Sequence, residues 1–199
     1  MKCNPLLIAM AAVLGLAGLV PGAIASDAED KAAVCAGCHG PNGHSTVPDN
    51  PILAAQYADY LTAALQAYIN GERDNRIMKT MAKRLSAEDM ADIAAYYAAQ
   101  PAKSSRAKAV GDVAAGKEKT AVCAGCHGPG GHGVSPMFPR LAGQHATYLS
   151  KALKAYRSGA RSSSVMLRQM TAALGDQEIE DIAAYYAAQP APQLEENPQ

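Results

Sequence analysis

The chain has 199 residues, and its 18 Lys and Arg balance 18 Asp and Glu, so the formal net charge is zero. That balance argues against a nucleic-acid-binding protein, which normally carries a basic excess or stripe. Nine Tyr, one Phe and no Trp are a poor supply of large core side chains, so something other than aromatic residues should fill the interior.

The first 25 residues have the order of a secretory signal peptide. Lys2 precedes an apolar run over 6–20, and the small residues before Ser26 are typical of a cleavage site. The run is shorter than the roughly 20 residues that a membrane-spanning helix needs; an uncleaved anchor is the alternative. We expect cleavage after Ala25, export to the periplasm and at most peripheral association with a membrane. Cys3 leaves with the signal, and its place ahead of the apolar run argues against lipid attachment.

The octet VCAGCHGP occurs at residues 34–41 and again at 122–129, and we expect a short helix before each copy, from about Ala28 and about Asp112. Without Cys3, every remaining cysteine lies in these octets: Cys35, Cys38, Cys123 and Cys126. Exported proteins usually use cysteine in disulfides. These four must serve another purpose, because no thiol is left over for a structural pair.

Three kinds of site could use Cys-x-x-Cys-His. A redox pair would need a βαβ context, which the sequence lacks, and it gives the histidine no role. A zinc site commonly takes its ligands from two Cys pairs a loop apart, but these pairs lie in separate repeats. Covalent haem attachment explains every position, because two thioethers hold the porphyrin and the next residue, His39 or His127, ligates the iron. We therefore predict two covalent haem c groups, whose apolar rings also fill the interior.

Downstream of the first octet the pattern is helical. Apolar residues recur at three- and four-residue spacing from Tyr57 to Tyr68, as on one face of a helix. Ser86 and Asp89 resemble a capping box, and the helix that they start should end at Pro101. No alternating strand pattern is evident, so the predicted fold class is all-α.

The second half repeats the first. Cys35 and Cys123 are 88 residues apart, as are Arg73 and Arg161, whereas DIAAYYAAQP at 92–101 returns 89 residues later. One residue is therefore inserted between Arg161 and Met170. Two copies are too few for a solenoid, which indicates two tandem domains. The predicted segments are a signal peptide (1–25), a first domain (26–102), a linker (103–111), a second domain (112–190) and a C-terminal tail (191–199).

The chain resembles the cytochrome c4 family, the periplasmic two-haem members of the class I cytochromes c. The resemblance covers about residues 27–190 and rests on CAGCHG in both halves, FPRLAGQHATYL at 138–149 and the closing DIAAYY helices. The first copy departs from the family at Ala55, where glycine is preferred. The resemblance implies two class I domains, each of a few helices around its haem. It also implies that the carbonyls of Pro51 and Pro139 accept hydrogen bonds from the ligand histidines and orient them.

The resemblance further implies an axial methionine seven residues before the leucine that opens the last helix. Met78 stands seven residues before Leu85. In the second half that position is Leu167, so Met166 is the predicted ligand and Met170 the alternative. Two further methionines are expected to pack rather than to bind iron: Met81 and Met137.

Other histidines and arginines could also face a haem. His44 and His132 could be ligands, as in bis-histidine cytochromes, but a solvated loop position is favoured. His145 is matched by a tyrosine in the other half, which argues against a shared haem role. Arg73 and Arg161 could pair with haem propionates or lie on a solvated face.

Methionine ligation would leave no open iron position, which favours an electron carrier over an enzyme. The resemblance implies a periplasmic carrier of single electrons in a respiratory chain. Its donor would be a quinol-oxidising complex, and its acceptor a terminal oxidase or a small copper protein. Two alternatives stay open: a dihaem peroxidase with one open iron, and a cytochrome subunit of a larger oxidoreductase.

Overall fold

The computed structural model of the chain describes residues 22–105 and 107–192. The α-helices are, in chain order, α1 (Gly22–His39), α2 (Ala58–Asn70), α3 (Arg76–Ala82), α4 (Ala87–Ala98), α5 (Val113–Lys119), α6 (Ala121–His127), α7 (Ala146–Ser158), α8 (Val165–Thr171) and α9 (Asp176–Ala188). Two 3-10 turns, η1 (Pro41–Gly43) and η2 (Pro129–Gly131), follow α1 and α6. Within the described ranges the β structure is limited to one isolated bridge, and the all-α prediction is confirmed. The predicted signal peptide falls mostly on residues outside these ranges.

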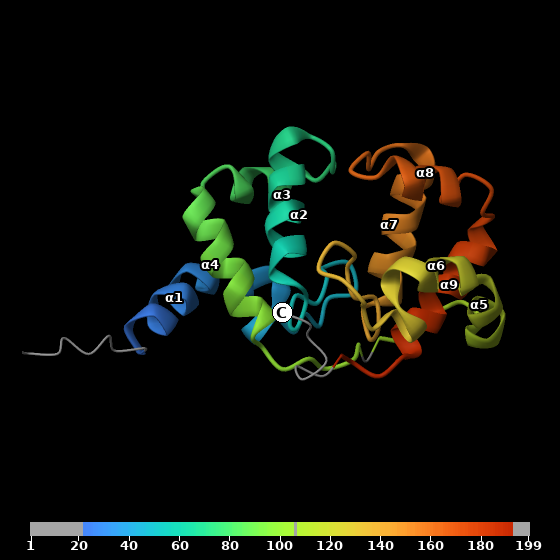
Figure 1. Cartoon of the computed structure of the whole chain (residues 1–199), viewed down its shortest axis with the longest axis horizontal. Helices are drawn as coiled ribbons and strands as arrows, with labels where there is room; N and C mark the ends of the chain where they lie inside the picture. The colour runs from blue at the N-terminus through green and yellow to red at the C-terminus, as the bar shows by residue number, and fades with distance from the viewer. Residues whose placement is uncertain (1–21, 106, 193–199) are drawn as a thin grey trace, which may run out of the picture.

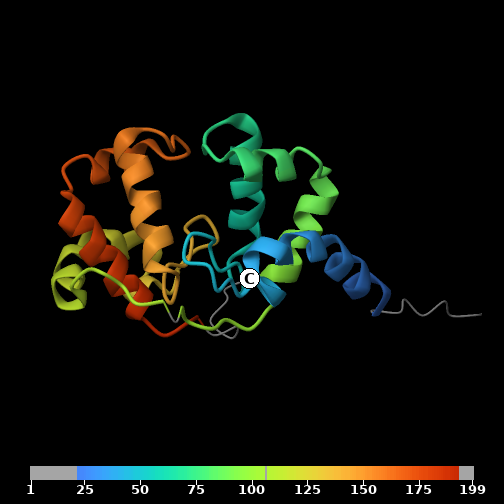
Figure 2. The ribbon, with the colours of Figure 1, turned by 180° about the vertical axis from the view of Figure 1, so that it is seen from behind.

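The helices form two bodies that lie side by side, α1–α4 and α5–α9 (Figure 1). In each body the last helix packs across the first helix and across the long middle helix, α4 on α1 and α2, and α9 on α5 and α7. Seen from behind, α2 and α7 again lie nearest the centre, and the last helix of each body lies on its outer side (Figure 2). The cores are separate, and their buried members are Ala32, Leu61, Ile93, Ala94 and Tyr97 in one, and Ala146, Leu149, Ile182, Ala183 and Tyr186 in the other. No helix in the part of the chain described here has both the length and the apolar character needed to cross a membrane.

Local signals set the helix ends. The Ser86 hydroxyl accepts a hydrogen bond from Asp89 N (3.0 Å), and the Asp89 carboxylate accepts one from Ser86 N (3.1 Å), which is the predicted capping box. The long middle helices both end at a left-handed glycine, Gly71 (φ 80°) and Gly159 (φ 82°). Glycine adopts this conformation without the steric cost that a side chain adds.

A short helix was expected to precede each octet, but the structure extends the helical segment through the octet itself. In both halves the Cys-x-x-Cys-His segment is itself helical, and α1 runs through it without interruption to His39. The second half breaks at Thr120, whose hydroxyl donates to the Lys117 carbonyl (2.8 Å). A β-branched residue that bonds its own preceding turn competes with the helix. Its counterpart Ala32 has no such hydroxyl, and α1 continues.

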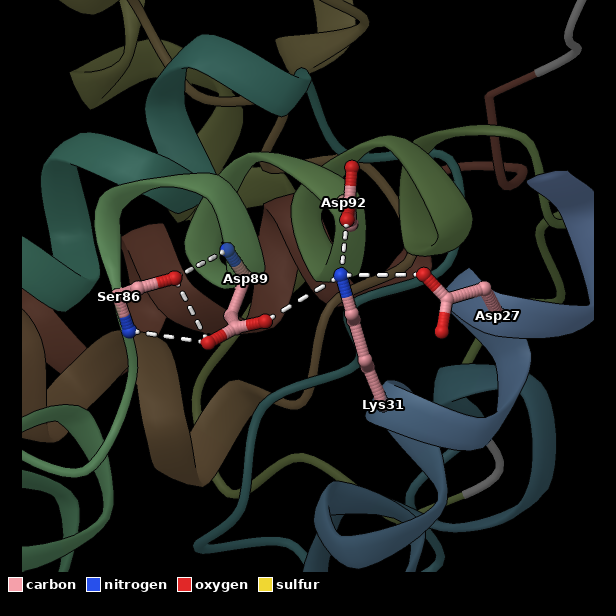
Figure 3. A network of polar contacts seen from close by, with 5 residues as sticks. All are labelled: Asp27, Lys31, Ser86, Asp89 and Asp92. Carbon is pink, nitrogen blue, oxygen red and sulfur yellow. Dashed lines mark hydrogen bonds and ion pairs between the residues drawn. The ribbon is translucent and has the colours of Figure 1, made fainter.

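Lys31 forms ion pairs that connect the first and last helices of the first body (Figure 3). Lys31 on α1 reaches Asp92 (2.5 Å) and Asp89 (3.3 Å) on α4, and these hydrogen-bonded carboxylates, Asp92 above all, raise its pKa. The second body repeats the pair with Lys119 and Asp181 at 3.1 Å. The partly exposed pairs of Lys31 each contribute little, whereas Asp181 in the second pair is buried.

Two glutamines join the bodies through reciprocal hydrogen bonds. The Gln56 amide donates to the Arg140 carbonyl and accepts from the Arg140 N–H, both at 3.0 Å. The Gln144 amide makes the same two bonds to the backbone of Ile52, both at 2.9 Å. Gln56 matches Gln144 in the repeat, and Ile52 matches Arg140. Such reciprocity is what a local two-fold axis between the domains produces.

The predicted linker lies in the non-helical stretch between α4 and α5 and contacts the second domain. Ser105 N donates to the Gly143 carbonyl (2.7 Å), and the Ser105 hydroxyl lies 2.6 Å from His145 Nδ1. The other ring nitrogen of His145, Nε2, donates to the Ser45 carbonyl (2.9 Å) in the first domain. One buried imidazole therefore connects both domains and the linker.

Candidate haem-binding sites

The two cysteines and the histidine of each octet lie on one helix face. Cys35, Cys38 and His39 occupy the end of α1 at positions i, i+3 and i+4, and neighbouring residues at this spacing share a face. The helix stops at Gly40 (φ 75°), where a Cβ would lie 2.2 Å from the His44 carbonyl oxygen. The α6 helix repeats this geometry and ends at Gly128 (φ 77°). All four cysteines of the octets are free thiols, so both pairs are available for thioether bonds.

Each octet histidine is buried and oriented by a proline carbonyl. His39 Nδ1 donates to Pro51 O (2.9 Å), and His127 Nδ1 donates to Pro139 O (2.8 Å). These are the hydrogen bonds that the family resemblance implies. A carbonyl can only accept, so the proton sits on Nδ1 and the lone pair of Nε2 is left for a metal. Burial lowers the pKa of both imidazoles, which keeps them neutral and able to ligate near pH 7.

The first cysteine of each octet lies beside a buried tyrosine, and in the first octet it is better buried than the second cysteine. Cys35 and Cys123 are half-buried beside the buried tyrosines Tyr97 and Tyr186, and burial raises the pKa of both thiols. Cys38 is exposed. Burial therefore disfavours the thiolate, which is the nucleophilic form of a thiol, at Cys35 and Cys123.

The methionine helices α3 and α8 are short and capped alike. Asn75 accepts from Met78 N (2.9 Å), and Ser164 accepts from Leu167 N (3.2 Å). In this register Leu167 is the counterpart of Met78. Arg73 and Arg161, which form the bridge, are 88 residues apart in the sequence. The capping residues Asn75 and Ser164 are 89 residues apart. The inserted residue of the second half therefore lies at position 162 or 163.

The insertion places Met166 one position before the counterpart of Met78. Its side chain is 46% exposed, whereas Met170, in the register of Met81, is half-buried. The two residues are four apart in α8 and therefore share a helix face. Met81 in turn lines an open hollow of about 390 Å³ together with Arg76, Ile77 and Thr80.

The remaining histidines and arginines are less exposed than expected. His44 and His132 are half-buried beside the 3-10 turns, and each has a buried Nδ1 without a hydrogen-bond partner. His145 is 2% exposed and serves the domain interface, a role that the sequence did not indicate because its counterpart is a tyrosine. Arg73 and Arg161 are 7% and 8% exposed, which excludes the solvated face.

Comparison with known proteins identifies the family. The cytochrome c family matches twice, at residues 30–99 and 113–188. Cytochrome c4 of Pseudomonas aeruginosa is 37% identical over 198 residues, which cover 92% of this chain and 97% of that protein. The chain belongs to the cytochrome c4 family. The crystal structure of reduced recombinant cytochrome c4 from Pseudomonas stutzeri aligns with a TM-score of 0.73 at 33% identity, covering 83% of this chain and 98% of that one. A protein of Thiomonas intermedia named thiosulfate dehydrogenase electron acceptor is 35% identical over 177 residues, 82% of each chain.

Membership of the cytochrome c4 family makes the chain a dihaem electron-transfer cytochrome with two covalently bound haem c groups. The described residues fit this cofactor. Each half offers a pair of free thiols and one neutral imidazole with Nε2 available. Val34 and Val122, which directly precede the first cysteine of each octet, are exposed apolar residues, and a haem would cover such surface.

Proposed function

We propose that this protein is a periplasmic dihaem carrier of single electrons between a quinol-oxidising complex and a terminal oxidase or small copper protein. The observation that carries the proposal is the duplication of a buried, proline-bonded histidine, His39 and His127, in two domains joined by reciprocal hydrogen bonds. When bound, each haem supplies reversible one-electron chemistry of its iron. The chain would hold the two haems in one fixed relation.

The proposed attachment residues are Cys35, Cys38, Cys123 and Cys126, and the proposed axial ligands are His39, Met78, His127 and Met166. A thioether ligand raises the reduction potential, which suits transfer toward a terminal acceptor. Met170 is the alternative to Met166, since it shares a face of α8 with it and is better buried. Two fully ligated irons would leave no open position for a substrate, and the protein would not be an enzyme.

The periplasmic location follows from the proposed signal peptide and from the use of all four remaining cysteines in haem attachment. Peptide mapping of the exported protein should find its N-terminus at Ser26. Acid extraction should leave two haems bound, and Cys123→Ala combined with Cys126→Ala should leave one. An N-terminus at Met1 in the mature protein would contradict export by a cleaved signal.

The carrier role is tested with membranes from the source organism that contain the quinol-oxidising complex and the oxidase. Added oxidised holoprotein should be reduced in the presence of quinol and reoxidised by oxygen, with both steps blocked by inhibitors of the respective complexes. Holoprotein that stays oxidised under these conditions would contradict the proposed donor.

A second candidate function is electron acceptor of a periplasmic dehydrogenase. The relative from Thiomonas intermedia, named thiosulfate dehydrogenase electron acceptor, favours it. Size analysis of the native complex separates the two. A carrier should elute as the free protein, whereas a dedicated acceptor should elute with its dehydrogenase and be reduced by thiosulfate in that fraction.

A further inference from the structure

His145 lies where three segments of the chain meet. It directly precedes α7 in the second domain, and only 2% of its surface is exposed. Its two ring nitrogens bond residues outside that domain, Ser45 in a loop of the first domain and Ser105 in the linker. The loops of the two domains meet at the centre of Figure 1, and the linker runs below them. Separation of the domains would therefore expose the imidazole to water.

The direction of each hydrogen bond at this imidazole is fixed by the groups that make it. A carbonyl can only accept, so His145 Nε2 donates its proton to Ser45 O (2.9 Å). The neutral ring has one proton, and Nδ1 therefore accepts the proton of the Ser105 hydroxyl (2.6 Å). The Ser105 oxygen in turn accepts from Ala107 N (3.2 Å). The bonds run in one direction, from the linker through the second domain to the first.

A second proton on the imidazole is incompatible with this arrangement. The proton would occupy Nδ1, so the Ser105 hydroxyl would lose its acceptor. The imidazolium would also be a buried charge without an ion pair among the residues that the structure describes. The titratable or charged side chains on the segments packed against it are His44, Asp49, Lys103, Lys108, Arg140 and Lys151. The single carboxylate in this set, Asp49, pairs with Lys151, and burial lowers the pKa of His145.

The first half of the chain offers a comparison that cannot respond in this way. Tyr57 occupies the position of His145, and it packs against Gly133, the counterpart of Ser45. A Cβ on Gly133 (φ 91°) would lie 2.4 Å from the Tyr57 hydroxyl oxygen, and the Arg140 guanidinium lies 4.4 Å from the centre of the tyrosine ring. A neutral phenol takes up no proton as the pH falls. The two halves of the interface therefore differ in their response to acid.

We propose that His145 is a positioning residue for electron transfer between the two haems, and that it releases the first domain and the linker when it gains a proton. The inference rests on the dihaem carrier proposed above. With the neutral ring in place, the two domains and the haems that they hold keep one relation. With the imidazolium, the docked arrangement is less populated. Acidification would therefore slow transfer between the haems without changing the ligands of either iron.

Acidification of the holoprotein tests the proposal by two measurements. Flash photoreduction of one haem gives the rate of transfer to the other, and this rate should fall severalfold as the pH drops from about 7.5 to 5. Hydrogen exchange at Ser105 N, which donates to the Gly143 carbonyl (2.7 Å), reports opening of the linker. Exchange in the unsubstituted protein should rise severalfold relative to His145→Gln at the same pH. That comparison cancels the intrinsic pH dependence of hydrogen exchange.

Substitutions separate the effect of the proton from a loss of packing. His145→Gln supplies an amide N–H in place of Nε2–H and does not titrate, so its transfer rate should stay near that of the unsubstituted protein and should not fall with acid. His145→Ala removes both ring contacts and should have the slow rate already at neutral pH. Ser105→Ala removes the linker contact and should increase exchange in the linker. Its matched control is Ser104→Ala, since exposed Ser104 bonds only the Gln189 carbonyl among the described residues (3.4 Å).

Two results would overturn the proposal. One is an equal pH profile of the unsubstituted protein and His145→Gln in either measurement. The other is a His145→Ala variant with the unsubstituted transfer rate at neutral pH. The midpoint potentials of His145→Gln should equal those of the unsubstituted protein, which excludes a change at the irons. Hydrogen exchange requires only folded holoprotein with two haems, so it still responds to pH if the carrier proposal fails, and the membrane assay detects that failure separately.

Discussion

The Gln144→Ala substitution tests whether the reciprocal amide contacts hold the domains together. The Gln144 side chain is buried and makes three hydrogen bonds. Its oxygen accepts from Ile52 N (2.9 Å) and His145 N (3.0 Å), and its nitrogen donates to Ile52 O (2.9 Å). Alanine removes all three and leaves two N–H groups without a partner.

The expected cost follows from these contacts. Each buried N–H group that loses its partner costs about 1–3 kcal/mol, so the two groups together give about 2–6 kcal/mol. The two bonds to Ile52 belong to domain docking, whereas the bond to His145 N belongs to the start of α7. More than half of the loss should therefore appear as weaker docking. Gln56→Ala should have a similar effect, because Gln56 accepts from Tyr57 N (3.1 Å) as Gln144 does from His145 N.

The assay is urea unfolding of the holoprotein, followed by circular dichroism, with small-angle scattering to detect separation of the domains. Gln66→Ala is the matched control, since Gln66 is exposed on α2 and its side chain bonds only Asn70 among the residues that the structure describes. The control should lie within about 0.5 kcal/mol of the unsubstituted protein. If Gln144→Ala matches the control in both measurements, the amide contacts do not stabilise the interface and the reasoning is wrong.

Three further predictions concern helix packing, pH and the second iron ligand. Gly116→Ala should destabilise the second domain by about 1–3 kcal/mol, because its Cβ would lie 2.0 Å from a backbone carbonyl oxygen of α9; Lys117→Ala in the same helix should be neutral in the same denaturation assay. Burial lowers the pKa of His145 in the folded protein, so as the pH falls this histidine is protonated in the unfolded state before it is protonated in the folded state. Stability should fall as the pH drops below about 6.5, and His145→Gln should reduce that slope in unfolding measured at several pH values. Met166→Ala should remove the weak thioether-to-ferric charge-transfer band of the second haem while Met170→Ala spares it; the reverse result would assign the ligand to Met170.

Features that depend on a few adjacent residues could be predicted from the sequence. The two octets and the capping box at Ser86 each depend on a few adjacent residues, whereas the two proline carbonyls, twelve residues after their histidines, were expected only from the family resemblance. The helical nature of the described segments followed from periodicity, which is also a local property of the sequence.

Features that depend on contacts between residues far apart in the sequence could not be predicted. Gln56 and Gln144 stand out only as polar residues in apolar segments, and nothing local shows that each bonds the other domain. Helix continuity through the first octet depends on Ala32, where the second half has the helix-breaking Thr120. The register of α8 depends on the position of the one inserted residue. The bridge at Arg161 and the cap at Ser164 determine that position in the structure, and no sequence signal indicates it.

The central claim is that both irons are fully ligated and that the protein carries electrons without binding a small substrate. Carbon monoxide binds ferrous haem only where an axial position is open or labile, so its addition to the fully reduced holoprotein tests this claim most directly. The account predicts an absorption spectrum that does not change, with both haems still rapidly reoxidised by an electron acceptor. Uptake of carbon monoxide by either iron of the unsubstituted protein would contradict the account and would point to a dihaem peroxidase.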